Sequence, residues 1–119
     1  MSEEKILIGI VGPCKAGKTT LVRNLEKHGY QARQIAQEHS FVPVMWQRIT
    51  NPDFLVYLDV TYPLTVERGR LNWTGADYQK QLDRLQHARE HADLYIETDP
   101  LSSDEVLRYV LDFLNATGA

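Results

Sequence analysis

The sequence has only one cysteine among its 119 residues and no apolar run long enough to cross a membrane. Because Cys14 has no partner within the chain, an internal disulfide is excluded. The start, Met1-Ser2-Glu3-Glu4-Lys5, is acidic and has no secretory-signal pattern. We therefore expect a cytoplasmic protein with no membrane partner.

An excess of positive charge is also missing. The 13 Lys and Arg stand against 16 Asp and Glu, which gives a net charge of −3 and no general attraction to nucleic acid. Linkers, repeats and low-complexity segments are absent from the sequence. With 43% hydrophobic and 24% charged residues, we expect one globular domain, residues 1–119, and no nucleic-acid partner.

Glycine is present at only 7 positions, and two of these lie in one motif, Gly12-Pro13-Cys14-Lys15-Ala16-Gly17-Lys18-Thr19. The apolar run at residues 5–11 before it is typical of a buried parallel strand. The residues after it have helical spacing up to Gly29. Strand, glycine loop and helix in this order are the context of a phosphate-binding loop, or P-loop.

The spacing of this motif has a chemical reason. Gly12 and Gly17 let the backbone curl so that amide N–H groups and the helix N-terminus face an anion. Lys18 can then neutralise the β and γ phosphates, and the Thr19 hydroxyl can bind Mg²⁺. For Cys14 two readings stay open, a variable position or a reactive thiol beside the helix N-terminus.

The rest of the chain alternates between strand and helix patterns. Strands are expected at residues 30–36, 54–60 and 93–98, and helices after Pro43, Pro63, Thr74 and either Ser102 or Ser103. Together with the first strand this predicts an α/β fold of three layers, with a small, mostly parallel sheet of about four strands flanked by helices. A homodimer is one way to cover the exposed edges of such a sheet.

The P-loop, the segment Pro52-Asp53-Phe54-Leu55-Val56-Tyr57-Leu58-Asp59-Val60 and Glu67-Arg68-Gly69-Arg70 together resemble the small P-loop kinases, in particular the thymidylate and other nucleoside monophosphate kinases. The ending Ala92-Asp93-Leu94-Tyr95-Ile96-Glu97-Thr98-Asp99 is similar to shikimate kinase and adenylylsulfate kinase. These families usually have five core strands, whereas this sequence shows four.

The resemblance implies a set of site residues. Arg68 and Arg70 match the start of the lid, whose arginines hold phosphates, although a solvated helix end is the alternative. Asp99 falls in the loop that lies against adenine in those kinases. The residues expected at the nucleotide are Gly12, Pro13, Cys14, Lys15, Ala16, Gly17, Lys18, Thr19, Thr20 and Asp99.

Two carboxylates are candidates beside the metal. Asp59 either serves the metal or only caps the segment that follows its strand. Glu38, at the end of the second strand, matches the acidic residue that acts as general base or in the outer shell of the metal. Its neighbour His39 reads as a surface histidine or a site residue, and no Cys/His cluster in the sequence suggests zinc.

These features favour an ATP-binding P-loop protein, a kinase-like phosphotransferase that uses Mg²⁺-ATP and an unknown small-molecule acceptor. Trp46 and Arg48 lie on the segment where that acceptor is expected. The alternative is a nucleotide-binding regulatory module or a weak ATPase. GTP specificity is not indicated, because the sequence has no Asn-Lys-x-Asp segment. The substitution Lys18→Ala is expected to weaken ATP binding and to leave the fold intact.

Overall fold

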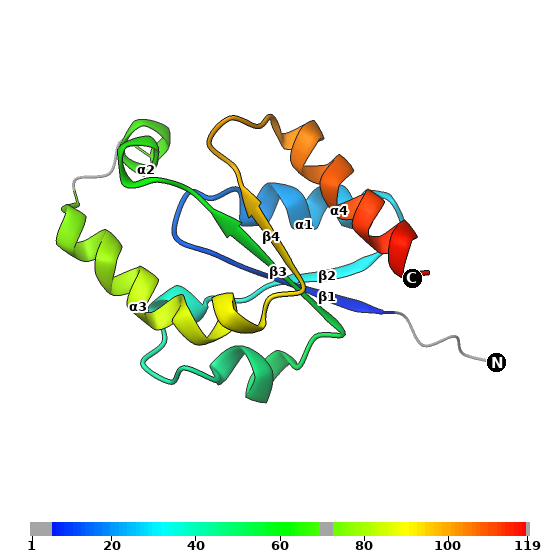
Figure 1. Cartoon of the computed structure of the whole chain (residues 1–119), viewed down its shortest axis with the longest axis horizontal. Coiled ribbons are helices and arrows are strands. Elements are labelled where there is room, and N and C mark those ends of the chain that lie inside the picture. The colour runs from blue at the N-terminus through cyan, green and yellow to red at the C-terminus, as the bar shows by residue number, and fades with distance from the viewer. Residues whose placement is uncertain (1–5, 70–72, 119) are drawn as a thin grey trace.

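A computed structural model describes residues 6–69 and 73–118 (Figure 1). The strands run in the order β2-β1-β3-β4, and every neighbouring pair is parallel, so the expected four-stranded α/β fold is confirmed. Within these residues the elements are β1 (Leu7–Val11), α1 (Lys18–Lys27), β2 (Gln31–Gln34), β3 (Phe54–Asp59), α2 (Tyr62–Gly69), α3 (Gly75–His91), β4 (Leu94–Glu97) and α4 (Ser103–Thr117).

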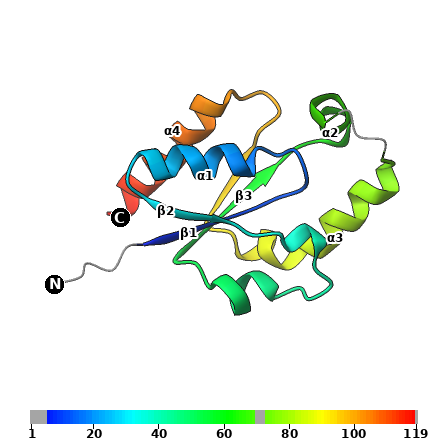
Figure 2. The ribbon, with the colours of Figure 1, turned by 180° about the vertical axis from the view of Figure 1, so that it is seen from behind.

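Helices cover both faces of the sheet, which makes three layers. Helices α1 and α4 lie on one face, and α3 with the turn at Trp46–Thr50 lies on the other (Figures 1 and 2). The α1 and α4 face buries Ile8, Ile10, Leu25, Leu58, Val110 and Leu114. The α3 face buries Val11, Ile35, Trp46, Leu55, Tyr57 and Leu85. Strands β1 and β3 are therefore buried from both sides, as their unbroken apolar runs predict.

Parallel pairing brings four strand ends to one edge of the sheet. Ile10 pairs with Val56, and Leu58 pairs with Ile96. The P-loop after β1, the turn after β2, helix α2 after β3 and the loop after β4 consequently meet at the carboxyl edge, where open α/β sheets bind ligands.

Two helices begin with reciprocal capping boxes. Thr74 and Asp77 exchange hydrogen bonds at the start of α3, and Ser102 and Glu105 do so at the start of α4. Of the two serines considered for the second cap, Ser102 is the one that caps. The bonds from the cap backbone and hydroxyl lower the pKa of both the Asp77 and the Glu105 carboxyl.

The segment after Pro43 differs from expectation. A π-helical turn at Trp46–Thr50 replaces the expected short α-helix, and it ends at Asn51, whose N–H donates to the Trp46 carbonyl at 3.1 Å. Asn51 has a φ of 44°, a conformation that asparagine tolerates better than most residues. Trp46 is buried in the α3 face, so it is a core residue, while Arg48 is exposed.

The residue spacing of α3 predicts a buried face with Tyr78, Leu82, Leu85 and Ala92 and a solvated face that includes Arg84, but the structure turns a different face inward. Leu85 is buried as expected, but its buried companions are Ala88 and the polar Gln81. Arg84, expected on a solvated surface, is half-buried and donates to the Glu38 carbonyl oxygen at 3.3 Å. Helix α3 therefore contributes polar groups to the edge of the P-loop. In residues 6–69 and 73–118, none of the helices combines the length and apolarity needed to cross a membrane.

Candidate functional site

The P-loop leaves β1 through Gly12 and enters α1 at Gly17. A Cβ at Gly12 would lie 2.1 Å from the Leu58 carbonyl oxygen of β3, and the φ of Gly12 is +154°. Gly17 is the N-cap of α1 in the left-handed conformation, with a φ of 96°. These two positions therefore require glycine, the first for close approach to β3 and the second for its backbone angle.

Lys18 turns back onto the loop that carries it. Its Nζ donates to the carbonyl oxygens of Gly12 at 2.5 Å and Pro13 at 3.1 Å, and it forms an ion pair with Glu38 Oε2 at 2.5 Å. Lys18 is 5% exposed and Glu38 2% exposed. The ammonium group is thus held by three acceptors of the protein itself.

Glu38 reaches this position from a short 3₁₀ turn, Gln37–His39, that follows β2. Its second carboxylate oxygen, Oε1, is buried and has no hydrogen-bond partner among residues 6–69 and 73–118. A buried acceptor without a donor costs about 1–3 kcal/mol. This oxygen is therefore ready to accept from a water molecule or to bind a cation.

A cavity of about 420 Å³ surrounds these groups, and we call it the Lys18 cavity. Within it the Thr19 hydroxyl donates to Gln34 Oε1 at 2.6 Å. The donor set of Thr19, Gln34 and Glu38 is composed of oxygen atoms, which suits a hard cation such as Mg²⁺. Its lining residues are Cys14, Lys15, Gly17, Lys18, Thr19, Thr20, Gln34, Glu38 and His39.

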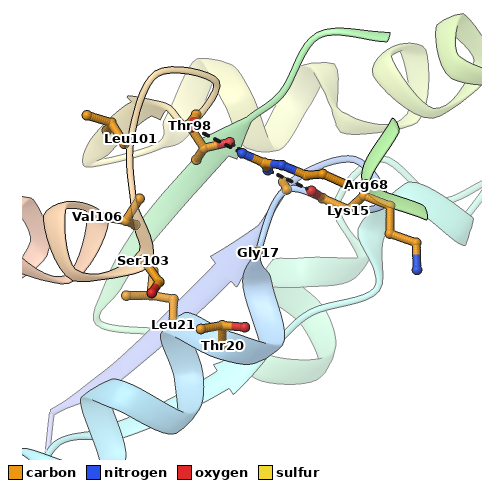
Figure 3. Close-up of a pocket in the computed structure, with 10 residues that line it drawn as sticks. Lys15, Gly17, Thr20, Leu21, Arg68, Thr98, Leu101, Ser103 and Val106 are labelled. Atoms are coloured by element: carbon orange, nitrogen blue, oxygen red, sulfur yellow. Dashed lines mark hydrogen bonds between the residues drawn. The ribbon is translucent and has the colours of Figure 1, made fainter. Parts of the chain in front are cut away.

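A second cavity, of about 330 Å³, lies on the other side of the P-loop beside α4, and we call it the Arg68 cavity (Figure 3). The Arg68 guanidinium donates to the Lys15 carbonyl oxygen at 2.9 Å and to the Thr98 carbonyl oxygen at 3.3 Å. It thereby connects the P-loop to the end of β4. The lining is partly apolar and consists of Lys15, Ala16, Gly17, Thr20, Leu21, Arg68, Thr98, Leu101, Ser103 and Val106.

The two aspartates predicted for the site accept hydrogen bonds from residues outside the two cavities. The Asp59 carboxylate accepts from its neighbour Val60 N–H at 2.9 Å and from the Tyr95 hydroxyl. Burial and this hydrogen bond raise the pKa of Tyr95 to about 12. Asp99 accepts from the backbone N–H of Thr61 at 2.9 Å and from its hydroxyl at 2.5 Å. Neither aspartate lines the Lys18 cavity or the Arg68 cavity.

The structure therefore brings together most of the predicted site, namely the P-loop with Lys18 and Thr19, and Glu38 and Arg68 on either side of it. Of the loop in which Asp99 falls, the structure brings Thr98, and not Asp99, to the Arg68 cavity. Arg70, the other predicted lid arginine, lies outside the described residues.

Gln81 is a side chain bonded to the P-loop that sequence reasoning missed. Its Oε1 accepts from the Cys14 backbone N–H at 3.0 Å, and its Nε2 donates to Cys14 Sγ at 3.1 Å. The only sequence signal was a glutamine beside the apolar positions of α3. Because 67 residues separate the two partners, no local pattern connects them.

No family model and no curated protein matches this sequence. Among solved structures, it is similar to the YorR protein from Bacillus subtilis in complex with phosphorylated GDP, with a TM-score of 0.67 and 14% identity over 94% of this chain and 97% of that chain. It is also similar to shikimate kinase from Acinetobacter baumannii in complex with shikimate, with a TM-score of 0.64 and 18% identity over 97% of this chain and 96% of that chain. The chain therefore has the fold of the P-loop kinases, with four strands in its sheet.

Proposed function

We propose that this protein binds Mg²⁺-ATP at its P-loop and transfers the γ-phosphoryl group to a small-molecule acceptor. The observation that carries the proposal is that the two cavities share Lys15, Gly17 and Thr20, at the N-terminus of α1. A nucleotide could therefore lie with its base and ribose in the partly apolar Arg68 cavity and its terminal phosphates in the Lys18 cavity, crossing the helix N-terminus that favours anions.

Each site residue has a part in this proposal. Lys18 would leave the carbonyl oxygens of the loop and bind the terminal phosphates, while Thr19 would hold Mg²⁺ with Glu38 in its outer shell. Bound Mg²⁺ would supply charge neutralisation at the phosphates. Arg68, now bonded to backbone carbonyls, would donate instead to phosphate oxygens. Glu38 could alternatively order the acceptor hydroxyl as general base.

The second candidate function is a nucleotide-binding module or a weak ATPase. The ion pair of Lys18 with Glu38 favours it, because nucleotide binding must pull the ammonium group away from a buried carboxylate. A site with this internal competition could bind nucleotide without efficient transfer.

The first experiment is a calorimetric titration of the whole chain with ATP, with and without Mg²⁺, and with GTP as comparison. We expect micromolar binding of ATP that depends on Mg²⁺. If neither nucleotide binds, both candidate functions are refuted.

The second experiment measures ADP formation in the presence of nucleosides, nucleoside monophosphates and small hydroxy acids. An acceptor that raises the rate at least tenfold over the basal rate supports the phosphotransferase. ATP binding without any such acceptor favours the module instead.

A further inference from the structure

Cys14 from the P-loop and Glu38 and His39 from the turn after β2 offer three potential metal ligands at one point. One sulfur, one carboxylate oxygen and one imidazole nitrogen lie within 4.8 Å of one another. We propose that these three residues form a binding site for a thiophilic divalent cation, with Zn²⁺ as the expected ion. This site differs from the oxygen-rich Mg²⁺ position in its sulfur and nitrogen donors.

Two of the three distances between the donor atoms are close to those of a tetrahedral zinc site. Cys14 Sγ lies 3.8 Å from His39 Nε2, and His39 Nε2 lies 3.8 Å from Glu38 Oε2. Zn–S and Zn–N bonds of about 2.3 Å and 2.1 Å at a tetrahedral angle require an S···N separation of about 3.6 Å. The third pair, Cys14 Sγ and a Glu38 carboxylate oxygen, lies within 4.8 Å, so closing the site requires a shift of the exposed His39 side chain and an approach of Cys14 and Glu38 of up to about 1 Å.

Two neighbouring side chains from α3 contact two of the three ligand residues. The Gln81 side chain donates to Cys14 Sγ and accepts from the Cys14 N–H, so the sulfur already receives a hydrogen bond. Arg84 donates to the Glu38 carbonyl oxygen. Such outer contacts orient metal ligands. Glu38, 2% exposed, also has its buried Oε1 without a hydrogen-bond partner in the described part of the chain.

The Lys18 ammonium pairs with Glu38 Oε2, the oxygen that lies 3.8 Å from His39 Nε2, while Oε1 of the same carboxylate has no hydrogen-bond partner among the described residues. The cation would therefore bind this carboxylate in competition with Lys18. On binding, the Cys14 thiol would release its proton to solvent and bind as thiolate. The three protein ligands leave a fourth position for water. Because Glu38 would serve both metals, Zn²⁺ should compete with Mg²⁺-ATP, and this competition alone rests on the proposed function.

The test uses Co²⁺, which substitutes for Zn²⁺ and gives a thiolate-to-metal absorption band in the near ultraviolet. We expect this band in the wild-type chain, its displacement by Zn²⁺, its loss in Cys14→Ser, and Zn²⁺ affinity at least about tenfold weaker in His39→Gln. Circular dichroism of each variant checks that the fold is retained. If Cys14→Ser does not fold, the thiolate band of the wild type and the Zn²⁺ affinity of His39→Gln still test the proposal.

A matched control is available on α3. His87 and His91 stack with ring centroids 4.2 Å apart, and neither is among the three proposed ligands. His91→Gln should leave the Co²⁺ band and the Zn²⁺ affinity unchanged. The proposal is overturned if the wild type shows no thiolate band, or if His91→Gln abolishes binding while Cys14→Ser and His39→Gln bind as tightly as the wild type. These readouts need no nucleotide, so they remain decisive even if ATP does not bind.

Discussion

At the scale of single residues, the buried ion pair of Lys18 and Glu38 contributes both to the stability of the fold and to the proposed nucleotide site. Both side chains are almost fully buried, and the ammonium group has three acceptors within 3.1 Å. A residue expected from sequence to belong only to the site therefore also supports the fold.

Lys18→Ala should weaken ATP binding and also lower the free energy of unfolding by about 3–5 kcal/mol, because it leaves the Glu38 carboxylate buried without its cation. This revises the sequence expectation of an intact, unaffected fold. Urea denaturation measures the change. The double variant Lys18→Ala with Glu38→Gln should recover part of the stability but not the ATP affinity. Lys27→Ala, at an exposed site in the last turn of α1, is the control; a loss of stability no larger than in this control would refute the role of the pair.

The two candidate metal-side carboxylates can be separated by isosteric substitutions. Glu38→Gln should remove most of the Mg²⁺ dependence of ATP binding, since Glu38 lines the Lys18 cavity. Asp59→Asn should leave this dependence unchanged, because Asp59 is bonded to Tyr95 on β4. Calorimetry of both variants with and without Mg²⁺ measures the difference. The reverse pattern would assign the metal to Asp59.

At the scale of secondary-structure elements, the loop between β1 and α1 depends on its contact with β3. Gly12→Ala would place a Cβ against the Leu58 carbonyl oxygen, which is backbone and cannot move aside cheaply. We expect this variant to lose ATP binding and more than about 2 kcal/mol of stability. Gly75→Ala, at the first position of α3 with nothing within 4 Å of its Cβ, should be neutral or slightly stabilising. Wild-type stability and binding in Gly12→Ala would contradict this account of the loop.

The two capping boxes predict how helices α3 and α4 respond to acid. The folded-state pKa of Asp77 and Glu105 lies below the ordinary values of 3.8 and 4.5. Such a carboxylate stabilises the folded state above its unfolded pKa, and this contribution is lost as the pH falls through the lower, folded pKa. Thermal unfolding from about pH 6 to about pH 3 should therefore show a smaller acid-induced loss in Asp77→Asn with Glu105→Gln than in the wild type. Asp104→Asn, beside the second box, is the control, and equal losses in all three chains would contradict the prediction.

At the scale of the whole molecule, the ligand site is assembled from segments far apart in the sequence. The P-loop, the turn after β2, helix α2 and the start of α4 all border the two cavities. A ligand that spans both cavities should therefore stabilise the entire fold. At a concentration about one hundred times its Kd, Mg²⁺-ATP should add about 2.7 kcal/mol and raise the melting temperature. Adenosine, which lacks phosphates, should give a much smaller shift; an equal shift would mean that the P-loop is not engaged.

Local patterns were sufficient for most of the fold. Apolar β-branched runs predicted β1 and β3, and helical spacing with cap residues predicted α1, α3 and α4. The turn at Trp46–Thr50 was predicted as α-helix because apolar spacing alone does not distinguish an α-helix from the wider π-helical turn that closes on Asn51. The buried Gln81 escaped notice because its partner, Cys14, lies 67 residues away.

The sequence alone determined the P-loop, with Lys18 and Thr19, because the constraints there are local: two glycines, one helix start and their spacing. It also marked Glu38 and Arg68 as candidates. Only the tertiary structure decided that Glu38 pairs with Lys18, that Arg68 bonds to the loop and that Asp59 turns to Tyr95. Those choices depend on which strands neighbour β1, since parallel pairing decides which distant residues meet at the carboxyl edge.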